Sequence, residues 1–129
     1  MRIIIAGAGE VGSHLAKMLS NESNDITVID SDQSRLDALA ANTDIVTLAG
    51  NSSEIRVLKE AGVADSDLFI AVNPSESQDV NIISAILAKK LGSHKVTARI
   101  NTEESLPAKF PHRRESPFRN RHCRESGTV

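Results

Sequence analysis

The sequence contains no tryptophan or tyrosine, three phenylalanines and a single cysteine, Cys123, among its 129 residues. With so few aromatic residues, a core must be built mainly from the aliphatic side chains that dominate its 40% hydrophobic content. A lone cysteine excludes an internal disulfide framework and suits a reducing compartment. No apolar run reaches the ~18 residues of a membrane-spanning helix, and the N-terminus does not resemble a signal peptide. We therefore expect one soluble, intracellular domain.

An excess of positive charge is also missing from most of the chain. Residues 107–129 hold six basic and two acidic residues, which leaves nine basic and fifteen acidic residues in 1–106. An acidic domain lacks the clustered Lys and Arg that neutralise a phosphate backbone, so no nucleic-acid partner is expected. Residues 107–129 also carry three of the four prolines and show no helical or strand periodicity. We predict that they form a basic tail, disordered or foreign to the natural protein, outside the folded unit 1–106.

The most informative stretch joins a strand to a helix through three glycines. The apolar residues 3–6 are typical of a strand buried on both faces, and apolar residues at helical spacing follow the glycines. A helix N-terminus offers unpaired N–H groups and a positive dipole end, which together bind anions. In this pattern Gly7 allows the tight turn, Gly9 lets a pyrophosphate approach, and Gly12 lets the helix pack closely on the strand. The stretch therefore predicts a nucleotide site.

A second apolar strand, residues 25–29, ends in Asp30, 18 positions after Gly12. That spacing is close to the ~20 positions expected for the acid that binds the ribose hydroxyls of a dinucleotide. A carboxylate there repels a 2′-phosphate, so NAD(H) should bind better than NADP(H). Asp32 either contacts the ligand as well or supports the N-terminus of the next helix.

The strand–helix alternation continues through the chain. Further strands are expected at 45–49, 68–72 and 95–100, and further helices at 33–42, from about 52 to 61, and from 75 to 91. This alternation predicts an α/β fold, a doubly wound parallel sheet of Rossmann-like strand order 3-2-1-4-5 in a three-layer αβα arrangement.

Several polar positions have expected local roles. Asn51 or Ser52 could be the N-cap of the third helix, and Glu54 could complete a capping box with Asn51. Ser75 with Gln78 fits a second capping box. Asn73 follows the fourth strand, so it should stand opposite the glycine loop at the topological switch point, as a ligand contact or as a turn residue.

The helix from 75 to 91 has more apolar residues than one buried stripe requires, which suggests a contact with a partner subunit. Arg99, in the fifth strand, could bind a phosphate bidentately or lie in solvent at the sheet edge.

Several blocks together resemble the N-terminal NAD-binding domain of Trk-type potassium uptake regulators, known as the TrkA-N, KTN or RCK family. The resemblance lies within residues 1–106 and is carried by residues 1–12, 28–32, 48–51, 58–67, 71–73, 79–81 and 98–100. It implies a cytoplasmic regulatory subunit that lies on the inner face of the membrane through its partner, a membrane potassium transporter subunit, and gates it. It also implies a homodimer or higher homo-oligomer that binds NAD or NADH, with ATP or ADP possible.

The resemblance extends to individual residues. Gly50-Asn51 stands where the family usually has Gly-Asp near the adenine, and Arg99 matches an arginine near the phosphates. The sixth strand and helix of the family, and the second half of its full-length regulators, are not recognisable in 107–129. The predicted cofactor-binding residues are Gly7, Ala8, Gly9, Glu10, Val11, Gly12, Asp30, Ser31, Gly50, Asn51, Asn73 and Arg99.

No catalytic or metal-ligating residue is predicted. Hydride transfer requires a positioned acid or base and a substrate pocket, usually on a further domain, and the four histidines lie away from the strand ends that face the pocket. We therefore expect a ligand sensor rather than an enzyme. Two alternatives stay open: the NAD-binding domain of a truncated dehydrogenase, and a structural α/β module whose glycine loop binds nothing.

Overall fold

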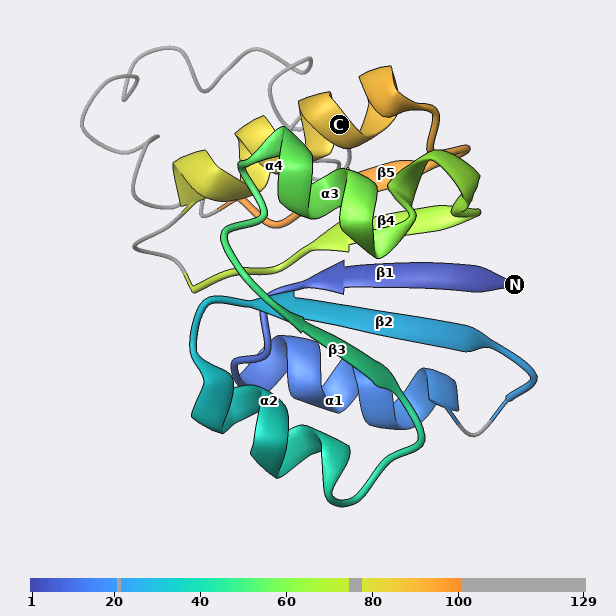
Figure 1. Cartoon of the computed structure of the whole chain (residues 1–129), viewed down its shortest axis with the longest axis vertical. Helices are drawn as coiled ribbons and strands as arrows, with labels where there is room; N and C mark the ends of the chain where they lie inside the picture. Colours follow the sequence, from blue (N-terminus) through green and yellow to red (C-terminus); the bar gives the residue numbers. More distant parts are fainter. Residues whose placement is uncertain (21, 75–77, 101–129) are drawn as a thin grey trace, which may run out of the picture.

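The computed structural model describes residues 1–20, 22–74 and 78–100, which form a parallel sheet between two pairs of helices (Figure 1). The sheet has five strands in the order β3-β2-β1-β4-β5, which confirms the predicted doubly wound α/β fold. In chain order the elements are β1 (Arg2–Ala6), α1 (Glu10–Ser20), β2 (Asp25–Asp30), α2 (Gln33–Ala40), β3 (Val46–Ala49), α3 (Ile55–Ala61), the 3₁₀ turn η1 (Val63–Asp65), β4 (Leu68–Ala71), α4 (Gln78–Leu91) and β5 (Val96–Ala98).

The strand register brings the loops after the strands to one edge of the sheet. Ala6 of β1 lies beside Ala71 of β4, which in turn lies beside Ala98 of β5. On the other side, Asp30 of β2 lies beside Ala49 of β3. Because all four strand pairs are parallel, the chain leaves every strand at this carboxyl edge, where ligands bind in doubly wound folds.

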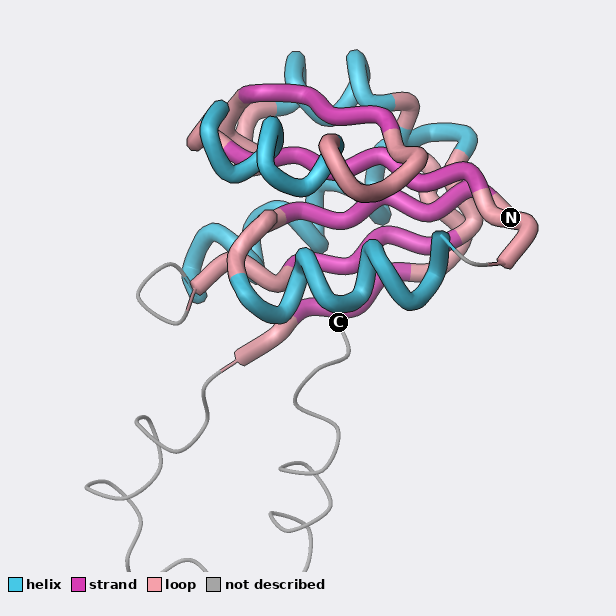
Figure 2. Tube along the Cα trace, turned by 90° about the horizontal axis from the view of Figure 1, so that it is seen from below, coloured by secondary structure: helices cyan, strands magenta, loops and turns pink. Residues whose placement is uncertain are grey.

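An aliphatic core lies on each face of the sheet, and Figure 2 shows the strands enclosed between the helices. Alternate β1 residues serve the two cores, because successive side chains of a strand point to opposite faces. Ile3 and Ile5 pack with Leu36 on the side of α1 and α2, whereas Ile4 packs with Phe69 on the side of α3 and α4. Burying each of these large side chains contributes about 1.5–3 kcal/mol.

Helix α1 packs through smaller residues than its sequence suggests. It begins at Glu10, inside the glycine motif, and buries Gly12 and Ala16 against the sheet. Val11 and Met18, two of the apolar residues at helical spacing that follow the glycines, are exposed. Small residues on the inner face let the helix axis lie close to the strands, which leaves these larger neighbours outside.

The predicted Asn51–Glu54 capping box does not form, and this prediction was wrong. Glu54 is the N-cap of α3 without a side-chain hydrogen bond. The Asn51 side chain accepts the N–H of Ser53 at 2.8 Å and its hydroxyl at 2.7 Å, which is the local turn that competes with capping. The predicted Ser75–Gln78 box lies outside the described residues.

The other helix and strand ends lie close to their predicted positions. Gly62 and Gly92 follow α3 and α4 with positive φ angles of 84° and 121°, as helix-terminating glycines do. Strand β5 is shorter than expected, so Arg99 follows the strand instead of lying inside it. Within the described ranges, no helix combines the length and the apolar character that crossing a bilayer requires.

Candidate functional site

Two of the three motif glycines are required by the packing of the protein itself. Gly7 has φ 118°, and a Cβ there would lie 2.8 Å from the backbone nitrogen of Asn73. A Cβ on Gly12 would lie 1.7 Å from the carbonyl oxygen of Gly7. Because these two positions lack a Cβ, three segments can pack in backbone contact: the β1 loop, the first turn of α1 and the chain that leaves β4. The expected roles of Gly7 and Gly12 are thereby explained by backbone contacts.

Gly9 has no such explanation. A Cβ built at this position would meet no atom of the described protein within 4 Å. Gly9 lies between β1 and the first turn of α1, where its carbonyl accepts the N–H of Ser13 at 2.9 Å. The space above its Cα is therefore open to a ligand at the start of the helix.

The first turn of α1 presents backbone amides to that space. The N–H groups of Glu10, Val11 and Gly12 lie in the first turn of α1, where the geometry of an α-helix provides no intrahelical acceptors. The N–H of Ala8, in contrast, donates to Asp30 at 2.7 Å and is already used. A diphosphate at this turn would therefore meet the amides of residues 10–12 and the positive end of the helix dipole.

Asp30 ends β2, beside the central strand β1, at the carboxyl edge and is buried, with 5% of its surface exposed. Its Oδ2 accepts the N–H of Ala8, and its Oδ1 accepts the N–H of Asp32 at 2.8 Å. Each carboxylate oxygen has a second lone pair. Asp30 therefore positions the glycine loop and keeps acceptor capacity for a hydroxyl pair.

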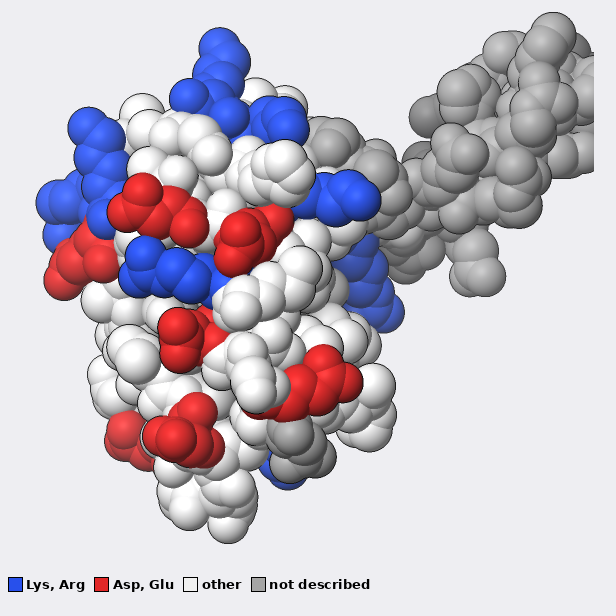
Figure 3. All heavy atoms as spheres, turned by 90° about the vertical axis from the view of Figure 1, so that its right-hand side faces the viewer, with Lys and Arg blue, Asp and Glu red and all other residues white. Residues whose placement is uncertain are grey.

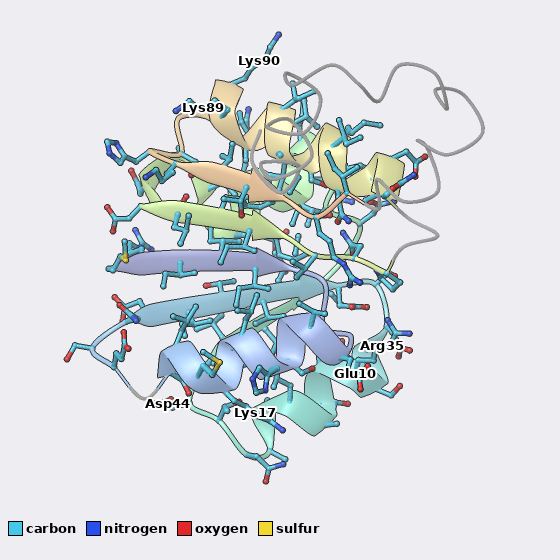
Figure 4. All side chains as sticks on the ribbon, turned by 180° about the vertical axis from the view of Figure 1, so that it is seen from behind. Glu10, Lys17, Arg35, Asp44, Lys89 and Lys90 are labelled. Atoms are coloured by element: carbon cyan, nitrogen blue, oxygen red, sulfur yellow. The ribbon has the colours of Figure 1, made fainter. Side chains whose placement is uncertain are left out.

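Arg35 of α2 lies beside this carboxylate, which the sequence did not predict. Its guanidinium is 3.8 Å from Asp30 Oδ2 and 3.7 Å from Asp32 Oδ2, and its side chain is about half exposed. Figure 4 shows Arg35 and Glu10 at the same end of the molecule. The i, i+3 spacing from Asp32 was a signal that could have identified the pair.

Asp32 is the N-cap of α2 and accepts the N–H of Ser34 at 3.0 Å. Hydrogen bonds from the hydroxyl and the N–H of Ser34 lower the pKa of Asp32 below its usual value. Asp32 thus has the structural role that was one of its two predicted roles, and its charge lies next to Arg35.

A polar cavity of about 120 Å³ opens next to Asp30. It unites five of the predicted residues from three separate loops, together with three that were not predicted. The predicted ones are Asp30, Ser31, Gly50, Asn51 and Asn73, and the others are Ile29, Ser52 and Val80. The sequence predicts Ser52 only as a possible helix cap, and Val80 only as one of the apolar residues of the helix from 75 to 91.

Asn81 of α4 holds the far wall of this site in place. Its side chain is 1% exposed and accepts the backbone N–H of Asn73 at 2.8 Å and the side-chain amide at 3.0 Å. Its own amide donates to the carbonyl oxygens of Asn73 and Arg99 at 3.1 and 3.0 Å. One buried side chain therefore ties together α4 and the chain ends of β4 and β5. The sequence block 79–81 had been noted only as part of the family resemblance.

Arg99 is the predicted residue least integrated into the site. It follows β5, its backbone N–H donates to the carbonyl of Ala71 at 2.8 Å, and its side chain is exposed. It does not line the cavity next to Asp30. Its place at the carboxyl edge is compatible with either of its two predicted roles.

A larger cavity, about 320 Å³, lies at the opposite, amino edge of the strands and is lined by Arg2, Asp25 and Asp44 among others. Figure 3 shows basic and acidic side chains intermingled on that face. It shares no residue with the glycine motif. In the part of the chain that the structure describes, no group of three His, Cys, Asp or Glu residues could hold a metal ion.

The sequence is similar to those of known proteins. The model of the TrkA-N domain matches residues 3–109. The chain belongs to the TrkA-N domain family. It shares 41% identity over 104 residues with a Trk system potassium uptake protein TrkA homolog of Archaeoglobus fulgidus, covering 81% of this chain and 23% of the relative. With the Trk system potassium uptake protein TrkA of Halomonas elongata it shares 47% over 91 residues, covering 70% and 20%. This TrkA-N domain thus spans about a quarter or less of these two relatives.

Solved structures share the fold. The C-terminal domain of Kef from Shewanella denitrificans, in an AMP-bound form, matches with a TM-score of 0.57 and 24% identity, covering 70% of this chain and 52% of that one. A putative short-chain dehydrogenase/reductase family oxidoreductase from Aeromonas hydrophila matches with a TM-score of 0.54 and 18% identity, covering 69% and 51%. The fold is therefore shared with oxidoreductases, whereas the two relatives named above carry the names of potassium uptake proteins.

Proposed function

We propose that this TrkA-N domain is a nucleotide sensor that binds an adenine dinucleotide, NAD or NADH, across the carboxyl edge of its sheet. The observation that carries the proposal is the open space at Gly9. Gly7 and Gly12 are explained by backbone contacts of less than 3 Å, whereas no described atom lies within 4 Å of a Cβ at Gly9. A glycine that the protein's own packing does not require is accounted for by a ligand that approaches its backbone.

The residues around Gly9 fit a dinucleotide. The amides of Glu10, Val11 and Gly12 would hold the pyrophosphate at the start of α1. The buried carboxylate of Asp30 would accept hydrogen bonds from the adenosine ribose through its remaining lone pairs. These groups lie on consecutive loops of the carboxyl edge, as the fold requires.

The adenine would lie toward the cavity that Ser31, Gly50, Asn51 and Asn73 line. Asn51 already uses its side-chain oxygen in the turn with Ser53, so its amide group is the part that would face a base. ATP and ADP share the adenosine and the diphosphate with NAD. They are the alternative ligands of the same site, and the AMP-bound state of the Kef domain concerns the same class of molecule.

In the cell, we propose that the domain belongs to the regulatory subunit of a potassium uptake system. The names of its relatives support this role. Such a subunit would be cytoplasmic and peripheral, held on the inner face of the membrane by a potassium transporter subunit, and would gate transport according to nucleotide occupancy. It would act as a homodimer or higher homo-oligomer. Residues 1–106 would form the nucleotide-binding unit, with 107–129 outside it.

Calorimetric titration of the whole chain with NAD, NADH, ATP and ADP tests the proposal. At least one nucleotide should release or absorb heat and raise the melting temperature, because a ligand that binds the folded state stabilises it. Gly9→Val should abolish binding while the melting temperature of the free protein stays close to that of the wild type. No heat with any of the four nucleotides, or normal binding by Gly9→Val, would contradict the proposed site.

The fold shared with an oxidoreductase supports a second candidate, the cofactor domain of a dehydrogenase. NADH oxidation with a panel of small carbonyl compounds distinguishes the two. Measurable turnover would favour the dehydrogenase, and binding without turnover the sensor.

A further inference from the structure

Glu10 is the only charged residue of the glycine motif, residues 7–12. It is the first residue of α1, its side chain is exposed, and its carboxylate has no hydrogen bond or ion pair among the residues that the structure describes. Side chains of a helix lean toward the helix N-terminus. The carboxylate of Glu10 therefore lies on the side of the carboxyl edge, beside the open space at Gly9.

The arginines at the carboxyl edge do not neutralise Glu10. Arg35 faces the carboxylate of Asp30 at 3.8 Å, on the side of the candidate ribose position. Arg56 of α3 pairs with the acid two residues earlier at 3.4 Å. Arg99 follows β5, which is separated from β1 by β4. The proposed diphosphate position thus combines backbone amides with one free carboxylate.

The first turn of α1 also lacks the groups that hold a longer phosphate chain elsewhere. In P-loop proteins a lysine reaches the β- and γ-phosphates, and a serine or threonine hydroxyl follows it. The glycine motif has no lysine or arginine, and the residue after it is Ser13. The hydroxyl of Ser13 donates to the carbonyl of Ala8 at 2.9 Å and already serves the loop.

We infer that Glu10 makes the proposed nucleotide site selective for a diphosphate esterified at both ends, as in NAD and NADH, over the terminal phosphates of ADP and ATP. The inference rests on the proposed function and chooses among its ligands. A phosphate esterified at both ends carries one negative charge, whereas a terminal phosphate carries nearly two, so the phosphate chain has about two charges in NADH, three in ADP and four in ATP. Glu10 repels each additional charge, and the glycine motif offers no cation to offset it.

The test uses ligands that share adenosine and differ in phosphate charge. ADP-ribose has the doubly esterified diphosphate of NADH without the nicotinamide, so contacts of that ring do not enter the comparison. The full chain is titrated calorimetrically with ADP-ribose, ADP and ATP at low salt and without Mg²⁺, which would neutralise the phosphates. The wild type should bind ADP-ribose more tightly than ATP.

Replacing Glu10 should change the three affinities by different factors. One unit of charge at roughly 8 Å in water changes a binding constant by about twofold. Relative to ADP-ribose, Glu10→Gln should therefore raise the affinity for ADP by about twofold and for ATP by about fourfold. Glu10→Lys changes the charge by twice as much and should square both factors. The effect of Glu10→Gln should shrink when the salt rises from about 0.05 M to about 0.5 M, because salt screens exposed charges.

Asp44→Asn is the matched control. Asp44 is an exposed acid that lines the cavity at the amino edge, and Figure 4 shows it and Glu10 toward opposite ends of the strands. The control removes the same charge and should leave the ratio of the ATP and ADP-ribose affinities unchanged. A role of Glu10 in the helix dipole alone would lower the melting temperature of Glu10→Gln without altering that ratio.

Three results would overturn the inference: tighter binding of ATP than of ADP-ribose by the wild type, an unaltered ratio in Glu10→Gln, or an equal shift in Asp44→Asn. In each of these cases a nucleotide still binds, so the proposed site stands and only the role of Glu10 is removed. Failure of every nucleotide to bind the wild type would remove both proposals.

Discussion

The carboxylate of Asp30 accepts the backbone N–H of Ala8 at 2.7 Å, so the acid at the end of β2 is fastened to the glycine loop that follows β1. The two residues lie 22 positions apart in the chain. This bond makes Asp30 a structural residue of the loop as well as the candidate ribose ligand, and any test of its binding role has to separate the two effects.

Replacing Asp30 should affect stability and binding to different extents in two variants. Asp30→Ala leaves the buried N–H of Ala8 without its acceptor and should cost about 1–3 kcal/mol of unfolding free energy. Asp30→Asn keeps one acceptor oxygen, so its stability loss should be smaller, while NADH binding should weaken by about 1–3 kcal/mol through the lost charge. Chemical denaturation and calorimetry measure the two quantities. Unchanged NADH affinity in Asp30→Asn would remove Asp30 from the ribose site.

Discrimination against a 2′-phosphate should depend on the balance between Asp30 and Arg35. In the wild type NADH should bind more tightly than NADPH, because the carboxylate repels the extra phosphate. In Asp30→Asn the guanidinium of Arg35, 3.8 Å from the Asp30 carboxylate in the wild type, becomes available to that phosphate. The NADH/NADPH affinity ratio should then fall at least about tenfold. Arg35→Ala in the same background is the control and should remove the gain in NADPH affinity. Equal affinities for NADH and NADPH in the wild type would contradict the assignment.

Adding a methyl group to Gly12 should lower the stability of the protein, whereas adding one to Gly9 should leave it nearly unchanged. Gly12→Ala places a Cβ 1.7 Å from the carbonyl oxygen of Gly7, so α1 must shift and stability should fall by roughly 2–4 kcal/mol. Gly9→Ala meets no described atom within 4 Å and should change stability by less than about 0.5 kcal/mol. Urea unfolding monitored by circular dichroism compares the pair directly. Equal losses in both variants would show that the loop is not packed as described.

Asn81 should be among the most sensitive polar positions of the domain. Asn81→Leu leaves the N–H and carbonyl of Asn73 and the carbonyl of Arg99 without their partner, and should cost roughly 2–4 kcal/mol. Asn42→Leu is the control, because Asn42 is exposed beyond α2. Thermal unfolding of both variants checks the difference. A melting temperature for Asn81→Leu within the range of the control would show that this amide contributes nothing to the fold.

The local predictions that failed did so for identifiable reasons. The side chain of Asn51 can cap a helix or bond to the nearby backbone. In the structure it accepts the N–H of Ser53 and does not cap α3. Val11 and Met18 occupy helical spacing on α1, but the close approach of Gly12 and Ala16 to the sheet rotated them outward. The first case is a competition between two local arrangements of the same side chain, whereas the second depends on strands that are distant in sequence from α1.

The sequence by itself determined the alternation of strands and helices, the strand order and the glycine–acid spacing of the candidate site, because apolar periodicity and backbone freedom are local properties. Only the tertiary structure decided that Gly9 is open while Gly12 is closed, that Arg35 faces Asp30, and that Asn81 ties two strand ends together. It also decided that Ile83 and Ile86 of α4 are exposed, whereas Ile82 is half-buried. Those facts depend on which surfaces meet across the sheet, and packing of that kind is set by residues from several elements at once.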